Sequence, residues 1–300
     1  MCEFCTQHGE GKVWYENARN YSDELLADPR RRRYLAEFFG NMERNHRRNE
    51  RLLAAVKELS PAAHRLVRRV LEPRQKRVHF GQILPVEDVE RVIDVAGQVA
   101  RIPCVCRKIL TGKELRYCFV FVAGPQEWLD PYPSYRAGLE VLSRDQAKAA
   151  IRHLDGEGLV HSVWTMLTPY IGGVCNCDAD CAAMRIQHRF NLLEVMWPGE
   201  RRARIDPERC EDCGACAEAC RFGAIRAGRG RAGAAAGAVA AGSAAGEAAA
   251  APSPLEVDPA ACYGCGLCRA RCPAGAIGLE PRDPASLLRA GSHPPLGRAP

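Results

Sequence analysis

The sequence predicts an α+β protein with three successive regions: a helical basic N-terminal region, a mixed α/β middle region that bears cysteines, and a C-terminal region built from two copies of one unit. Three observations predict it. Apolar residues recur at helical spacing in the first 80 residues, helix-like and strand-like patterns alternate after them, and a 21-residue segment recurs near the end. The predicted divisions are 1–80, 81–200 and 203–282, the last interrupted by a low-complexity insertion at 227–254 and followed by a disordered tail at 283–300.

Two apolar stripes and one cap predict three helices in the basic region. The stripes consist of Tyr34, Leu35, Phe38 and Phe39, and of Leu52, Leu53, Val56 and Leu59. Ser60 before Pro61 is typical of a helix start, since serine caps the first free N–H groups and proline suits the first turn. The third helix is therefore expected to begin at Pro61.

Helices and strands alternate in the middle region. The segment from Pro85, "PVEDVERVIDVAGQVA", has apolar residues at helical spacing and acidic residues in its first turn. Ser143 and Gln146 form the sequence of a capping box at the start of another helix. The runs "RYCFVFV" and "LVHSVWTML" predict buried strands. A helix followed by a short hairpin-like strand also fits a winged-helix-like fold.

Sixteen cysteines dominate the chemistry of the chain. No signal peptide or apolar run long enough to span a membrane is found, so we expect a cytoplasmic protein without membrane insertion. The cytoplasm keeps thiols reduced, which disfavours a disulfide scaffold and favours metal or redox chemistry.

Eight of the cysteines form two runs of C-x2-C-x2-C-x3-C. "IDPERCEDCGACAEACRFGAI" and "VDPAACYGCGLCRARCPAGAI" align at an offset of 52 residues, with ten of 21 positions identical. Zinc ribbons use pairs of cysteines separated by a longer loop, whereas these runs place four within eleven residues. The runs are Cys210, Cys213, Cys216 and Cys220, and Cys262, Cys265, Cys268 and Cys272 followed by Pro273.

Residues 204–280 closely resemble bacterial-type dicluster ferredoxin domains. The resemblance implies a βαββαβ unit with two [4Fe–4S] clusters that passes single electrons, in which the fourth cysteine of each run binds the other run's cluster. Arg221 replaces the usual proline after the first run, so we expect the two clusters to differ in reduction potential. The implied ligand sets are Cys210, Cys213, Cys216 and Cys272 for cluster 1, and Cys262, Cys265, Cys268 and Cys220 for cluster 2.

Six further cysteines form two matching patterns, each a C-x-C pair with a third cysteine. On a strand, residues i and i+2 point the same way, so such a pair presents both sulfurs to one site. The alternatives are small buried side chains, zinc, or a third iron–sulfur cluster held by the two loops, which we favour. These candidate ligands are Cys104, Cys106 and Cys118, and Cys175, Cys177 and Cys181.

The start of the chain offers another candidate. Cys2, Cys5 and His8 have C-x2-C-x2-H spacing, which suits zinc or the completion of another site. Residues 1–200, with "MCEFCTQHGEGKVWY" and "PCVCR", loosely resemble the N-terminal region of ferredoxin-tailed iron–sulfur proteins of anaerobes. That resemblance implies an association with electron transfer, not a particular reaction. His161 is expected to be a packed side chain, and Trp164 and Trp197 to lie in the core.

Residues 27–80 hold 15 Lys and Arg against 6 Asp and Glu. We favour a docking surface for an acidic redox partner over a nucleic-acid site, because aromatic side chains are not interleaved with the arginines. The predicted function is an electron-transfer protein or oxidoreductase subunit. The alternatives are a redox enzyme acting at the spare cysteines and an iron–sulfur regulator that binds DNA. No nucleotide-binding glycine motif or Ser/His/Asp arrangement is present.

Overall fold

The computed structural model describes residues 3–56, 60–122, 124, 128–227 and 255–283. Helices and strands are mixed along the chain, as the α+β prediction requires. Most of the predicted insertion and nearly all of the predicted tail lie outside the described residues. No helix among the described residues has the length and apolar character needed to cross a membrane.

The basic region is helical, and it begins with short elements that pack into the core. Ser60 accepts from the backbone N–H of Ala63, so the predicted cap is present. The elements are α1 (Glu3–His8), the 3-10 turns η1 (Trp14–Glu16) and η2 (Ala18–Tyr21), α2 (Asp23–Ala27), α3 (Pro29–Val56) and α4 (Pro61–Val78).

The first predicted apolar stripe faces the core. Leu35 and Phe39 are buried, and Tyr34 and Phe38 pack beside them. Leu52 is 53% exposed, so this member of the second stripe does not contribute to the core. The other side chains of that second stripe lie outside the described residues. The N-terminal half of α3 is thus anchored, whereas its C-terminal part carries exposed side chains.

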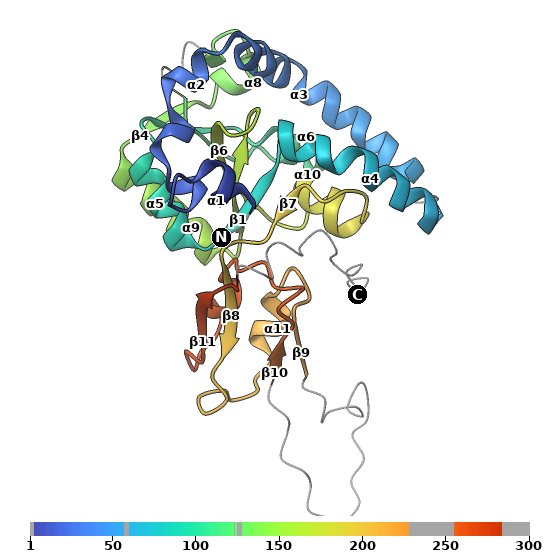
Figure 1. The fold of residues 1–300 in the computed structure, drawn as a ribbon, viewed down its shortest axis with the longest axis vertical. Coiled ribbons are helices and arrows are strands. Elements are labelled where there is room, and N and C mark those ends of the chain that lie inside the picture. Colours follow the sequence, from blue (N-terminus) through green and yellow to red (C-terminus); the bar gives the residue numbers. More distant parts are fainter. Residues whose placement is uncertain (1–2, 57–59, 123, 125–127, 228–254, 284–300) are drawn as a thin grey trace, which may run out of the picture.

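A seven-stranded sheet forms the centre of the molecule (Figure 1). Its order is β4-β2-β3-β6-β5-β1-β7, antiparallel except between β1 and β7. The winged-helix prediction was wrong, because the predicted strands join this large sheet. The strands are β1 (Gly81–Leu84), β2 (Val99–Ile102), β3 (Cys118–Val120), β4 (Glu140–Leu142), β5 (Val160–Thr165), β6 (Ile171–Cys177) and β7 (Met196–Trp197).

Helices cover both faces of this sheet. Successive strand residues point to opposite faces, so Phe119 joins one apolar cluster with α5 and α9, and Val120 joins another with α3 and α6. The capping box of Ser143 and Gln146 starts α9 as predicted. These helices are α5 (Val86–Val95), α6 (Val105–Thr111), α8 (Pro133–Arg136), α9 (Arg144–Gly156) and α10 (Ala182–Met184), followed by the π-helical turn η3 (Arg185–Arg189).

The repeated unit follows as a smaller module that lies below the sheet in Figure 1. Strands β8 and β11 pair antiparallel, as do β9 and β10. Ala227 lies opposite Leu255, so the chain leaves and re-enters the described structure at neighbouring strand ends. The elements run in the order β8 (Arg201–Ile205), α11 (Ala215–Ala219), β9 (Ile225–Ala227), β10 (Leu255–Val257), α12 (Leu267–Ala270) and β11 (Ile277–Pro281).

Charged side chains attach this module to the sheet region. Arg269 donates twice to Glu87 of α5, at 2.9 and 2.7 Å. The nearly buried Arg282 donates to the backbone oxygens of Gly199 and Cys262, which joins the end of β11 to the chain before β8. The module is therefore held in a defined position against α5.

Candidate metal centres

Two small cavities in the C-terminal module are each lined by four cysteines. One cavity, which we call the outer site, is lined by Cys210, Cys213, Cys216 and Cys272. The second, the inner site, is lined by Cys220, Cys262, Cys265 and Cys268. In both cavities the fourth thiol comes from the other cysteine run, and four sulfur donors around one cavity suit an iron–sulfur cluster.

The two halves of the module repeat the same local geometry. Gly214 and Gly266 have φ of 80° and 84°, a left-handed conformation that glycine adopts without strain, and each precedes a short helix. The N–H of Ala224 donates to Cys220 Sγ at 3.2 Å, and the N–H of Ala276 donates to Cys272 Sγ at the same distance. These N–H groups stabilise negative charge on the sulfurs.

The two sites differ in their contact with solvent. Cys213 of the outer site is exposed, whereas Cys265 and Cys268 of the inner site are buried. Desolvation raises the pKa of Cys268 to about 12, and that of Cys265 also lies well above its usual value. Removal of these protons therefore needs a strong compensating positive charge, such as that of iron.

The six remaining candidate ligands of the middle region come together in space, and we call them the six-cysteine site. Cys118 on β3 lies directly opposite Cys175 on β6, in register. Cys177 ends β6, and Cys181 occupies the N-cap position of the following helix. Two segments distant in sequence therefore bring these four cysteines to neighbouring ends of β3 and β6.

The first C-x-C pair does not lie on a strand. Cys104 occupies the N-cap position of α6 without a capping hydrogen bond from its side chain, and Cys106 lies in the first turn. Their Sγ atoms are nevertheless 3.3 Å apart. The strand geometry that we expected for a C-x-C pair holds for Cys175 and Cys177, and a helix start achieves the same convergence for the other pair.

The thiols of this site interact with one another directly. Hydrogen bonds from the thiols of Cys106 and Cys118 lower the pKa of Cys104 far below its usual value. The hydrogen bond with Cys104, followed by that with Cys175, raises the pKa of Cys118, and the hydrogen bond with Cys181 raises that of Cys177. The arrangement thus favours a thiolate at Cys104 and the protonated form at Cys118 and Cys177.

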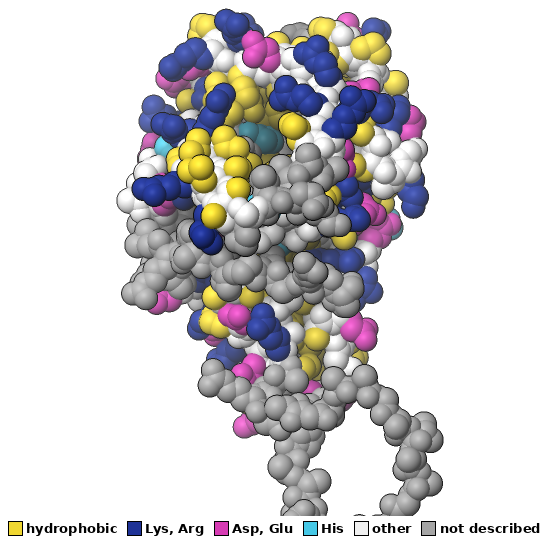
Figure 2. Space-filling model, turned by 90° about the vertical axis from the view of Figure 1, so that its right-hand side faces the viewer, with side chains coloured by type: hydrophobic (Ala, Val, Ile, Leu, Met, Phe, Trp, Pro, Cys, Tyr) yellow, Lys and Arg dark blue, Asp and Glu magenta, His cyan; other side chains and the backbone are white. Residues whose placement is uncertain are grey.

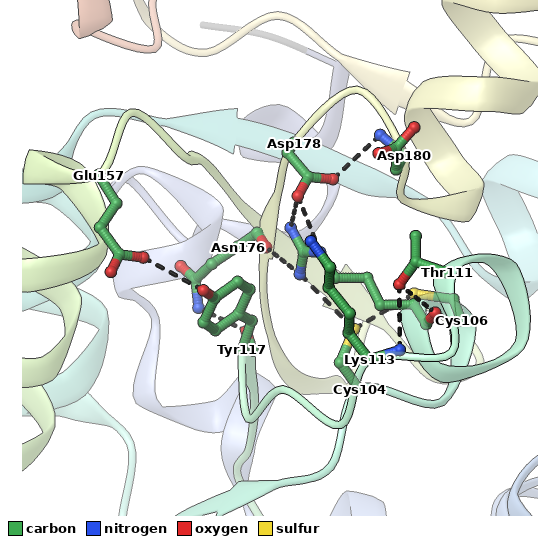
Figure 3. A network of polar contacts seen from close by, with 10 residues as sticks. Cys104, Cys106, Thr111, Lys113, Tyr117, Glu157, Asn176, Asp178 and Asp180 are labelled. Carbon is green, nitrogen blue, oxygen red and sulfur yellow. Dashed lines mark hydrogen bonds and ion pairs between the residues drawn. The ribbon is translucent and has the colours of Figure 1, made fainter.

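A buried arginine, Arg107, supplies positive charge at this site. Its partners Cys104, Tyr117, Asn176 and Asp178 are labelled in Figure 3. Arg107 is 1% exposed, and its Nη1 lies 3.6 Å from Cys104 Sγ. Its other contacts fix its position: it pairs with Asp178 at 2.9 Å, donates to the backbone oxygen of Asn176, and lies over the Tyr117 ring. The "CVCR" sequence places this cation beside the thiols, a role that the spacing pattern did not indicate.

An apolar cluster connects the six-cysteine site to the inner site. It contains thiols of both sites, among them Cys177, Cys181 and Cys265, and it contains Phe222 and Tyr263. The Phe222 and Tyr263 rings stack with centroids 4.3 Å apart. The two sites therefore share one water-poor environment.

The π-helical turn η3, which follows Cys181 by a few residues, reaches this aromatic pair. Gln187 Nε2 contacts the Tyr263 hydroxyl at 2.6 Å. The His188 ring meets both aromatic rings edge-on. A continuous set of side chains thus runs from the six-cysteine site to the wall of the inner site, and none of these connecting residues had been identified from the sequence.

The N-terminal candidates lie elsewhere. Cys2 lies outside the described residues, and Cys5 is buried in an aromatic cluster, where its thiol contacts Glu200 at 3.2 Å. The backbone oxygen of His8 accepts from Asn17 and Asn20. Cys5 belongs to the core cluster that contains Trp14, which is a different cluster from that of the six-cysteine site.

The predictions for single aromatic and histidine residues are confirmed. His161 is fully buried, with Nδ1 2.6 Å from Asn176 Oδ1, and Trp164 and Trp197 are each 6% exposed.

Among the residues that the structure describes, no three His, Cys, Asp or Glu side chains are arranged to hold a single metal ion.

Comparison with known proteins identifies the cysteine runs. Residues 203–226 and 255–278 each match the 4Fe-4S binding domain family. No curated protein and no solved structure matches the chain. The two matched segments each contain one cysteine run and part of both cavities. The chain is therefore an iron–sulfur protein of the electron-transfer type that carries two 4Fe-4S binding domains.

Proposed function

We propose that this protein passes electrons through two [4Fe–4S] clusters, one in the outer site and one in the inner site. The observation that carries the proposal is that each cavity is lined by three cysteines of one run and the fourth of the other. The element order of the module supports a βαββαβ ferredoxin-type arrangement. When bound, such clusters accept and release single electrons.

Exposure gives the two clusters different roles in this proposal. The outer site, with the exposed Cys213, exchanges electrons with a redox partner protein. The inner site is buried and shares an apolar cluster with the six-cysteine site. Electrons enter at the outer cluster, move to the inner cluster and continue toward the middle region.

The proposal includes a third metal centre at the six-cysteine site. Thiolates are soft ligands suited to iron–sulfur clusters and to zinc, and the electron path from the inner site favours iron–sulfur. A four-iron cluster in its 2+ state with four thiolates carries a net charge of 2−, and the buried cation of Arg107 offsets part of that charge. Single cysteine-to-alanine variants, each followed by iron analysis, identify the four thiols that bind the cluster.

A redox enzyme that acts at the six-cysteine site is the second candidate. It is favoured by a groove that Tyr135 lines, because Tyr135 belongs to the apolar cluster against which Cys118 packs. Two further ideas remain predictions from the sequence: docking of an acidic redox partner on the basic helices, and binding of DNA.

Paired cysteine variants test the two ligand sets. Cys213→Ala and Cys272→Ala should abolish the same EPR signal of the anaerobically reduced protein, since both line the outer site. Cys220→Ala and Cys265→Ala should abolish the other. If Cys272→Ala removes the same signal as Cys265→Ala, the crossed assignment is wrong. Loss of both signals in every variant would instead show that neither cavity is an independent cluster site.

A further inference from the structure

A groove beside the six-cysteine site is lined by arginines. It lies between the second half of α3 and the segment that leads into α8, with a volume of about 800 Å³. This size is within the range of roughly 300–1,000 Å³ typical of small-molecule sites. Its charged lining residues are Glu43 and the arginines Arg44, Arg47, Arg48 and Arg51.

The spacing of the four arginines places them along one side of α3. Residues at i, i+3, i+4 and i+7 share a helix face, and all four are exposed. Figure 2 views the side on which α3 and α4 end, where Lys and Arg side chains are frequent over the upper part. The four guanidinium groups that line the groove give it a strong positive electrostatic potential.

Nearby carboxylates neutralise this charge only in part. Glu37 pairs with Arg33, and Glu50 pairs with Arg185. Glu43 lines the groove and accepts from the Ser134 hydroxyl at 2.6 Å, which does not cancel its charge, so four arginines of the lining face one carboxylate. Among the described residues, no carboxylate forms an ion pair with Arg47, Arg48 or Arg51. Three planar donors therefore remain available to an anion, and arginine binds phosphate and carboxylate oxygens through two parallel hydrogen bonds.

Aromatic packing fixes the opposite wall of the groove. A Cβ at Gly40 would lie 3.2 Å from the Tyr132 ring, so glycine permits this close approach. The Tyr135 ring packs edge-on against Phe39, and its hydroxyl contacts Met42 Sδ at 2.6 Å. The two walls thus face each other in a fixed geometry, which lowers the entropic cost of binding.

We propose that this groove binds a small organic polyanion, with at least two phosphate or carboxylate groups held by Arg47, Arg48 and Arg51. A groove of this size is better suited to binding a small molecule than to binding a flat protein surface. Tyr135 lines the groove and belongs to the apolar cluster against which Cys118 packs, so a ligand in the groove lies beside the cluster that supports the six-cysteine site. The proposal depends on the groove alone and not on a third cluster.

Calorimetric titration of the full, anaerobically purified protein with tripolyphosphate and with citrate tests the proposal. The variant Arg47→Gln/Arg48→Gln/Arg51→Gln should weaken saturable binding about tenfold or more. The matched control, Arg65→Gln/Arg69→Gln/Arg74→Gln, removes the same charge from exposed positions of α4 and should leave the affinity within about twofold. Equal iron content in both variants shows that the cluster sites are intact.

Three results overturn the proposal. One is the absence of saturable binding of either anion to the unmodified protein. Another is equal weakening in both triple variants, which would mean a diffuse field and not a site. The last is binding of hexaglutamate, but of neither small anion, through the arginines of the groove, which would assign this face to an acidic partner segment.

Discussion

The two cysteine-rich parts of this molecule are built in different ways. In the ferredoxin-type module, each site depends on a short run whose turns, glycines and N–H donors recur at an offset of 52 residues. The six-cysteine site depends on the pairing of β3 with β6 and on the start of α6. A local motif therefore specifies the first kind of site, and tertiary structure assembles the second.

The largest effect on stability is expected from removal of Arg107, the buried cation of the six-cysteine site. Arg107→Met leaves Asp178 without its partner and the thiols without a compensating charge. We expect a loss of about 3 kcal/mol in unfolding free energy, near the low end for a broken buried pair because Asp178 is partly exposed. The reduction potential of a cluster at this site should also fall, since positive charge stabilises its reduced form.

Urea unfolding and an EPR-monitored redox titration measure both changes. Arg107→Lys, which keeps the charge, serves as the control and should retain most of the potential. If Arg107→Met alters stability but leaves every potential unchanged, the arginine has a structural role only.

An intermediate effect on stability is expected where β3 and β6 meet at the six-cysteine site. A Cβ at Gly173 would lie 2.2 Å from the backbone oxygen of Phe119, so Gly173→Ala must separate β6 from β3 and with them Cys175 from Cys118. We expect a loss of about 1–3 kcal/mol in unfolding free energy. Iron should be lost from the six-cysteine site and retained in the module.

Gly97→Ala is the control, because its added Cβ meets nothing within 4 Å. Thermal unfolding and iron analysis compare the two variants. Retention of all iron in a destabilised Gly173→Ala protein would show that the strand register does not support a metal centre.

The smallest effect is expected at the contact between the two regions. Arg269→Gln removes the pair with Glu87, whose side chains are each about one-third exposed. Such a pair contributes under about 1 kcal/mol. A double-mutant cycle with Glu87→Gln in urea unfolding gives the coupling. A coupling above about 2 kcal/mol would mean that the module and the sheet region unfold as one tightly coupled unit.

The sequence predicted the parts that depend on local patterns. The caps at Ser60 and Ser143, the strand over 160–165 and the two cysteine runs follow from residue type and spacing. The winged-helix interpretation failed because strand order is set by pairings between distant segments, which no local pattern encodes. The apolar spacing at Leu52 did not indicate its exposure, because periodicity identifies an apolar face but not its partner.

The sequence predicted which cysteines form the six-cysteine site but not how they are arranged. An excess of cysteines in two matching patterns indicated it, and the structure brings those cysteines together. The helix start at Cys104, the buried Arg107 and the aromatic pair beside the inner site had no signal in spacing. These three features depend on tertiary packing between segments that are distant in the sequence.

Iron and acid-labile sulfide per chain, measured after anaerobic purification, test the third centre most directly. Four-iron clusters in three sites predict about twelve irons and twelve sulfides. The variant Cys175→Ala/Cys177→Ala/Cys181→Ala leaves three thiols at the six-cysteine site and should hold about eight of each, with the EPR signals of the module unchanged. About eight irons in the unmodified protein, or the same count in both proteins, would contradict a third iron–sulfur cluster.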